Sequence, residues 1–66
     1  MNYIDAIKDL MLENGLNQDK FAKRIGVNQT TISQWLLGKK KPSYDNIAAI
    51  CTIFKITPNE FFGFDK

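Results

Sequence analysis

The sequence predicts an all-α fold, a compact bundle of five short helices around one core. Apolar residues recur at intervals of three and four, as they do on one face of a helix. Residue types that begin or end helices stand between these segments, and no segment shows the alternation typical of a strand. The chain has 66 residues, so we expect a single domain, residues 1–66, with a small core and no appended effector domain.

The first two helices are predicted on either side of Asn14-Gly15. The first runs from about Asn2 to Glu13. Asn17 then caps the second helix, which ends at Gly26 because glycine adopts the left-handed conformation at little cost. The apolar residues of the first helix repeat at helical spacing: Ile4, Ile7, Leu10 and Met11.

The third helix is predicted between Asn28 as its cap and Gly38, where it ends. With the second helix it forms a pair joined by a tight turn, over residues 17–37. Ala22 is expected where the two helices cross. Each helix has one inner, apolar face: Phe21, Ile25, Val27, Ile32 and Trp35.

The last two helices have clear start signals. A Lys-rich connector is held extended by Pro42, and Ser43 then caps the fourth helix. Thr57 and Glu60 flank Pro58 in the pattern of a capping box with proline at the first helical position. The fourth helix carries one apolar stripe: Ile47, Ile50, Cys51 and Phe54.

The outer face of the third helix is polar but uncharged. It carries Gln29, Thr30, Ser33 and Gln34. Side chains of this kind, on a short helix flanked by lysines, are suited to reading base edges in a DNA major groove. On an isolated helix the same face would more often serve only solubility, so the prediction depends on its surroundings.

Charge is distributed unevenly along the chain. Residues 17–41 contain six basic residues and one acidic residue, a balance of +5, whereas the remainder carries −3 and the whole chain +2. A basic middle directs one face of the protein toward a polyanion. We therefore expect duplex DNA as the partner, with lysines 39–41 near phosphates; ordinary solvated charge is the simpler alternative.

The ordered motifs from residue 16 to 57 resemble the Cro/phage-repressor type of helix-turn-helix proteins, also called Xre-like, whose fold is lambda-repressor-like. The resemblance covers nearly the whole chain. Its carriers are Leu16-Asn17-Gln18, Phe21-Ala22, Ile25-Gly26-Val27, Ile32-Ser33-Gln34-Trp35, Gly38-Lys39-Lys40-Lys41-Pro42-Ser43 and Phe54-Lys55-Ile56-Thr57.

The resemblance implies roles for individual residues. It makes the third helix the recognition helix, with Gln29, Thr30 and Gln34 facing bases and Ser33 as a weaker candidate. It also implies contacts to the DNA phosphates from Asn17, Gln18, Asn28, Lys39, Lys40 and Lys41.

The sequence departs from the family at Met11 and Leu36. Many members have an Arg–Glu pair at these two positions, and here both partners are apolar. Replacing an ion pair by apolar contacts is often neutral or stabilising, so we expect Met11 and Leu36 to touch. Leu37 is a further departure and is expected to be exposed.

The C-terminal residues are rich in phenylalanine. Phe61, Phe62 and Phe64 cannot all face one small core, so one is expected to close it and at least one to be exposed. Exposed aromatic residues are enriched at interface centres. We therefore assign these three to a homodimer interface, formed at least on DNA, with an ordinary chain-end aromatic as the alternative.

Other classes of protein fit the sequence poorly. It contains no histidine and one cysteine, placed in an apolar stripe, so neither an enzyme nor a metal or cofactor site is expected. No apolar run approaches the roughly 20 residues of a membrane span, and no secretory signal is visible; we expect a cytoplasmic protein with no membrane partner.

The predicted function is that of a sequence-specific transcriptional regulator, with repression expected over activation. The first alternative is an antitoxin that binds its own operator and a toxin protein. The second is a helical module that binds only proteins, against which the basic 17–41 segment argues.

Overall fold

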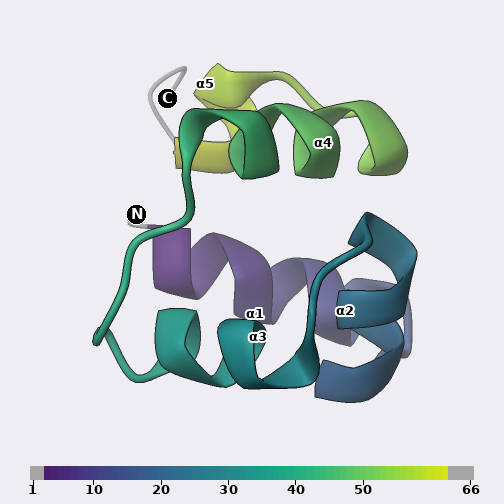
Figure 1. Cartoon of the computed structure of the whole chain (residues 1–66). Coiled ribbons are helices and arrows are strands. Elements are labelled where there is room, and N and C mark those ends of the chain that lie inside the picture. The colour runs from purple at the N-terminus through teal and green to yellow at the C-terminus, as the bar shows by residue number, and fades with distance from the viewer. Residues whose placement is uncertain (1–2, 63–66) are drawn as a thin grey trace.

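A computed structural model describes residues 3–62, with side chains to residue 61. It contains five helices in this range, joined by short connections (Figure 1). They are α1 (Tyr3–Glu13), α2 (Gln18–Ile25), α3 (Gln29–Leu36), α4 (Tyr44–Phe54) and α5 (Pro58–Phe62). The predicted all-α bundle is confirmed. Asn2, the predicted first residue of α1, lies outside the described residues.

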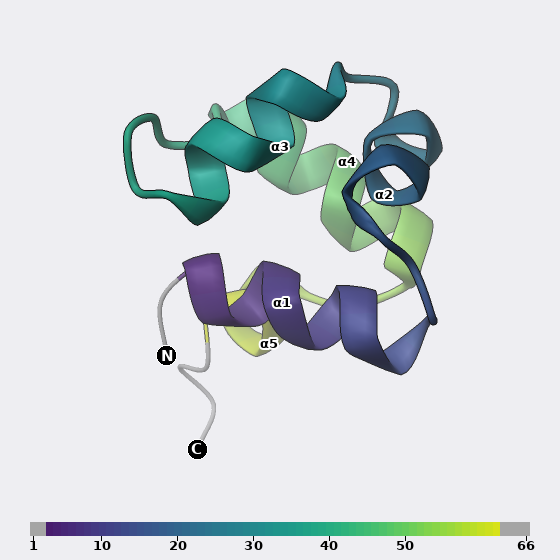
Figure 2. The same ribbon diagram turned by 90° about the horizontal axis from the view of Figure 1, so that it is seen from below.

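The helices form around one apolar core. α2 and α3 pack against each other, α4 contacts α2, and α1 lies against both α3 and α5. Figure 2 shows α3 on one side of the molecule and α1 with α5 on the other. This arrangement places the outer face of α3 on the surface, away from the α1–α5 pair.

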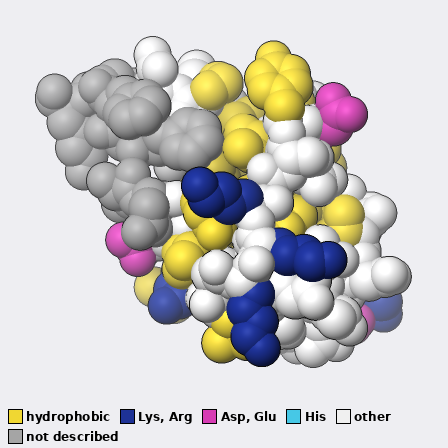
Figure 3. All heavy atoms as spheres, turned by 60° about the vertical axis from the view of Figure 1, so that its left-hand side comes forward, with side chains coloured by type: hydrophobic (Ala, Val, Ile, Leu, Met, Phe, Trp, Pro, Cys, Tyr) yellow, Lys and Arg dark blue, Asp and Glu magenta, His cyan; other side chains and the backbone are white. Residues whose placement is uncertain are grey.

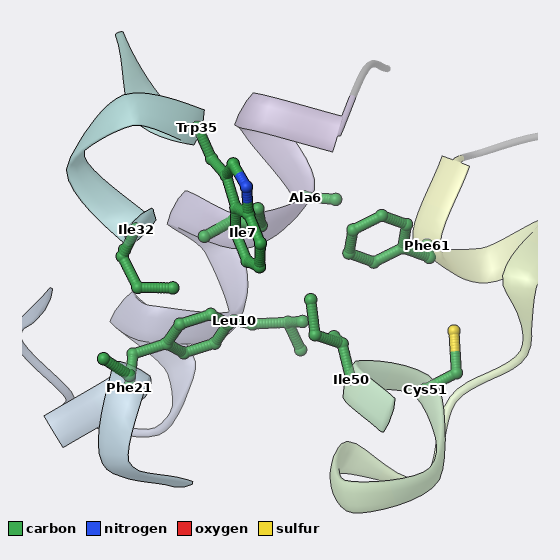
Figure 4. Packing of buried hydrophobic residues seen from close by; sticks show 10 residues of the cluster. Ala6, Ile7, Leu10, Phe21, Ile32, Trp35, Ile50, Cys51 and Phe61 are labelled. Carbon is green, nitrogen blue, oxygen red and sulfur yellow. The ribbon is translucent and has the colours of Figure 1, made fainter. Parts of the chain in front are cut away.

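Bulky side chains from all five helices meet in the core (Figure 4). Trp35 is 2% exposed and Phe21 is fully buried, as the inner faces of α2 and α3 predict. The other buried side chains of the hydrophobic core are Ala6, Ile7, Leu10, Ala22, Ile32, Ile50, Cys51 and Phe61. Such burial contributes about 1.5–3 kcal/mol for each large side chain.

Most predicted caps are present. Asn17 accepts a hydrogen bond from the Lys20 backbone N–H at 2.8 Å, and Ser43 accepts one from Asn46 at 3.2 Å. Thr57 and Glu60 exchange two bonds of 3.1 and 3.2 Å, which is the predicted capping box. These bonds satisfy backbone donors that a helix start leaves without partners.

The predicted cap at Asn28 is wrong in one respect. Asn28 precedes α3 in an extended conformation, but its side chain makes no capping hydrogen bond. Its backbone carbonyl instead accepts from Thr31 and Ile32. Because an Ncap carbonyl can accept the first bonds of a helix without help from the side chain, α3 still begins there.

Candidate nucleic-acid interface

The turn between α2 and α3 is held by backbone hydrogen bonds among Ala22, Gly26 and Val27. Gly26 has φ 80° and its N–H donates to the Ala22 carbonyl at 2.9 Å, and the N–H of Val27 donates to the same carbonyl at 3.0 Å. The helix therefore ends at a residue in the left-handed backbone conformation, which favours glycine. The chain therefore reverses within residues 26–28 and α3 begins at once.

The buried side of α3 determines which side chains are left outside. Ile32 and Trp35 point into the core. Gln29 and Thr30 are exposed near the start of the helix, and Gln34 is half-buried further along it. α3 contains no charged residue, so its outer face offers amide and hydroxyl groups alone.

Ser33 has a structural partner that the sequence did not suggest. Its hydroxyl donates to the Gln18 side-chain oxygen at 2.6 Å, and Ser33 is half-buried. This bond connects the middle of α3 to the first residue of α2, so Ser33 links the two helices. A contact from Ser33 to a base stays a prediction.

Two side-chain amides lie at the start of α2. The carbonyl oxygen of Asn17 accepts from Lys20, and that of Gln18 accepts from Ser33. The NH₂ group of each amide can only donate. A helix start also favours anions. The geometry is therefore suited to a phosphate, as the predicted contacts of Asn17 and Gln18 require.

The connector after α3 carries three exposed lysines, Lys39, Lys40 and Lys41. Figure 3 shows Lys and Arg side chains gathered on one face of the molecule. The backbone here is held in place, since the N–H of Lys39 donates to Gln34 at 2.9 Å and the Tyr3 hydroxyl donates to the Lys40 carbonyl at 3.4 Å. None of the three lysines forms an ion pair within residues 3–61.

Two basic residues of α2 have partners of their own. Lys23 lies 3.2 Å from the Asp19 carboxylate in an exposed pair, and the Arg24 guanidinium sits 5.4 Å from the centre of the Phe54 ring. An exposed pair contributes at most about 1 kcal/mol. The connector lysines, which lack such partners among the described residues, are the better placed cations for a polyanion.

The assignment of Phe61 to a dimer interface is wrong. Phe61 is 1% exposed and lies in the core near Ala6 and Ile50 (Figure 4). A residue buried in its own subunit has no surface to offer a second one. Phe62 has no described side chain and Phe64 lies outside the described residues, so both stay predictions.

Two exposed apolar side chains stand on either side of the connector in the sequence. Leu37 is 69% exposed, as predicted. Tyr44, at the start of α4, is 83% exposed, which was not predicted from the sequence.

The chain belongs to the Cro/phage-repressor type of helix-turn-helix family, a family of DNA-binding transcription regulators, which its sequence matches over residues 7–61. Within residues 3–62, no helix is long and apolar enough to cross a membrane.

Two individual proteins are similar to it. One is an HTH-type transcriptional activator, BcrR, from Enterococcus faecalis, 28% identical over 63 residues. The match covers 96% of this chain but 31% of that protein. The other is the crystal structure of a transcriptional regulator from Listeria innocua, with a TM-score of 0.84 and 22% identity, covering 98% of this chain and 61% of that one. The second likeness shows the shared fold.

Proposed function

We propose that this chain binds duplex DNA with sequence preference and thereby regulates transcription. The observation that carries the proposal is the uncharged polar face of α3, with Gln29 and Thr30 exposed, followed directly by the three exposed lysines of the connector. Polar groups on a short helix read base edges, and lysines supply affinity by displacing counterions.

Gln29 is the principal base contact in this proposal. Its side-chain carbonyl accepts from N6 of adenine while its NH₂ group donates to N7, a bidentate match. Thr30 offers its methyl group to thymine or its hydroxyl to several bases. Gln34 lies five residues further on and reaches a second base pair.

The contacts to the backbone come from groups around α3. The amides of Asn17, Gln18 and Asn28 donate to phosphates, and lysines 39–41 neutralise them. Such contacts set the position of the helix but carry no sequence information. The Ser33–Gln18 hydrogen bond supports this division, because it ties the phosphate-facing start of α2 to the base-facing helix.

We propose that the DNA-bound form is a homodimer. α3 has eight residues, about 12 Å at 1.5 Å per residue, and reads only a few base pairs. A two-fold dimer places two such helices about 34–36 Å apart, one turn of DNA. Phe62 and Phe64 are the candidate interface residues; a 1:1 complex that persists with protein in excess would contradict the dimer.

Repression is the proposed outcome of binding, because occupying a promoter requires no contact beyond the DNA. The E. faecalis relative is named an activator, so a separate experiment must test whether this chain represses or activates transcription. A reporter placed behind the selected site should lose expression when the chain is supplied. A gain in expression would reverse the assignment.

The proposal is tested by selecting bound sequences from a pool of random duplexes. We expect enrichment of a short, two-fold symmetric site containing adenine at a position that Gln29 reaches. A Gln29→Ala, Thr30→Ala variant, carried through the same selection, should lose that preference while still binding DNA. Enrichment of no sequence by the unmodified chain would refute sequence-specific binding.

A further inference from the structure

A groove lies between α1 and α5. Figure 2 shows these two helices on the side of the molecule away from α3. It encloses a volume of about 210 Å³. Its walls are formed by Ala6, Asp9, Leu10, Glu13, Ile56, Glu60 and Phe61. The proposed DNA contacts use none of these residues.

The floor of the groove is apolar. Ala6, Leu10 and Phe61 belong to the core, and Ile56 is a half-buried residue packed against it. The volume is smaller than the roughly 300–1,000 Å³ of pockets for drug-sized ligands. The groove is therefore sized for one apolar side chain of a partner rather than for a small-molecule effector.

The rim of the groove is acidic. Asp9, Glu13 and Glu60 are all exposed, and the described residues that form the walls include no basic one. Ala6, Asp9, Leu10 and Glu13 stand at i, i+3, i+4 and i+7, so they share one face of α1. The rim carries its negative charge although the whole chain is +2.

The two carboxylates of α1 are placed unfavourably within this chain. Asp9 and Glu13 are like charges at i, i+4, which destabilises a helix. Glu13 also stands at the C-terminal end of α1, where the helix dipole disfavours an anion and where no basic residue accompanies it. Within residues 3–61 neither carboxylate forms an ion pair. A cation brought by a partner would offset both costs.

We propose that this groove docks a basic amphipathic segment of a partner protein, with one apolar side chain in the cavity and Lys or Arg at the rim. The proposal does not rest on DNA binding. Because α3 lies on the other side, a partner and DNA can be bound together.

A second copy of the chain is the less suitable occupant. Its matching feature is Leu37, exposed beside lysines 39–41. That contact would join two different surfaces, head to tail, and such contacts build open chains unless they happen to close. It would also cover the lysines proposed to contact DNA.

The test is an NMR titration of the ¹⁵N-labelled chain with a helical probe peptide of about 14 residues, four turns, with leucine on one face and lysine on the other. Two matched peptides serve as controls: one replaces lysine by glutamate, the other leucine by serine. We expect saturable changes in the amide chemical shifts of α1 and α5 with the leucine–lysine peptide and with neither control. Shifts centred on another surface, or equal binding by the serine peptide, would overturn the proposal.

Charge reversals in the chain provide the second comparison. Glu13→Lys should lower the affinity for the lysine peptide about fivefold or more, the equivalent of an exposed ion pair. Asp45→Lys makes the same change of net charge at an exposed position outside the groove and should leave the affinity within about twofold. Equal losses in both variants would mean attraction by overall charge. Sedimentation of the free chain adds one further outcome: if it dimerises and the peptide dissociates the dimer, a second copy is the occupant and the proposal fails.

Discussion

Replacing Phe61 by alanine tests whether this residue belongs to the core. Its side chain is 1% exposed, and α5, with five residues, is too short to be stable without packing. Removing a buried phenylalanine costs about 3–5 kcal/mol. The total stability of a chain of this length is only about 3–10 kcal/mol, at 0.05–0.15 kcal/mol per residue. Phe61→Ala should therefore lose a third or more of the stability, or fail to fold.

The assay is urea unfolding, followed by circular dichroism and by the fluorescence of Trp35, which is buried. With a slope of about 1 kcal/mol per molar urea, the midpoint of Phe61→Ala should fall by about 3–5 M. The midpoint of Phe61→Leu, a substitution that retains most of the side-chain volume, should fall by less. Leu12→Ala, at a position 82% exposed, should stay within about 0.5 kcal/mol. If Phe61→Ala kept full stability and lost only self-association, Phe61 would be an interface residue after all.

Three further predictions concern stability. Met11→Arg should cost about 1–3 kcal/mol in urea unfolding, and adding Leu36→Glu should restore part of that loss if the two residues touch; independent, additive losses would show that they do not. Ser33→Ala and Gln18→Ala should show a coupling of about 0.5–1.5 kcal/mol in a double-mutant cycle, and zero coupling would mean that their hydrogen bond does not join the helices. Burial, and next the charge of Glu60, raise the pKa of the Cys51 thiol, so folding favours the protonated form. The stabilisation is complete below the ordinary thiol pKa and is lost as pH rises through the raised one. The free energy of unfolding should therefore decrease more above about pH 8.5 in the unmodified chain than in Cys51→Ala, and parallel pH profiles would contradict this.

Local signals in the sequence predicted the fold well. Asn17, Gly26 and Ser43 act at helix ends where their residue types favour it, because capping depends on a few neighbouring atoms. The end of α4 had no such signal. It ends at Lys55, which adopts the left-handed conformation with φ 57°, a cost that only the surrounding fold can impose.

The candidate site was predicted in part. Periodicity placed Gln29 and Thr30 outside, since burial of one face of α3 exposes the other. It could not show that Ser33 bonds Gln18, because that contact depends on the crossing angle of two helices. Nor could it decide which of three nearby phenylalanines fills the core. That choice depends on how α5 docks; Phe61 is buried.

The central proposal is that α3 reads bases while the connector holds the backbone. The most direct measurement compares the affinities of Gln29→Ala and Lys40→Ala for the selected duplex and for random duplex, across a range of salt. Gln29→Ala should lose about 1–3 kcal/mol on the selected site and little on random DNA. Lys40→Ala should weaken both alike and reduce the salt slope by about one unit. Equal losses on both duplexes for Gln29→Ala would make Gln29 a backbone contact and contradict the assignment of α3 as the reading helix.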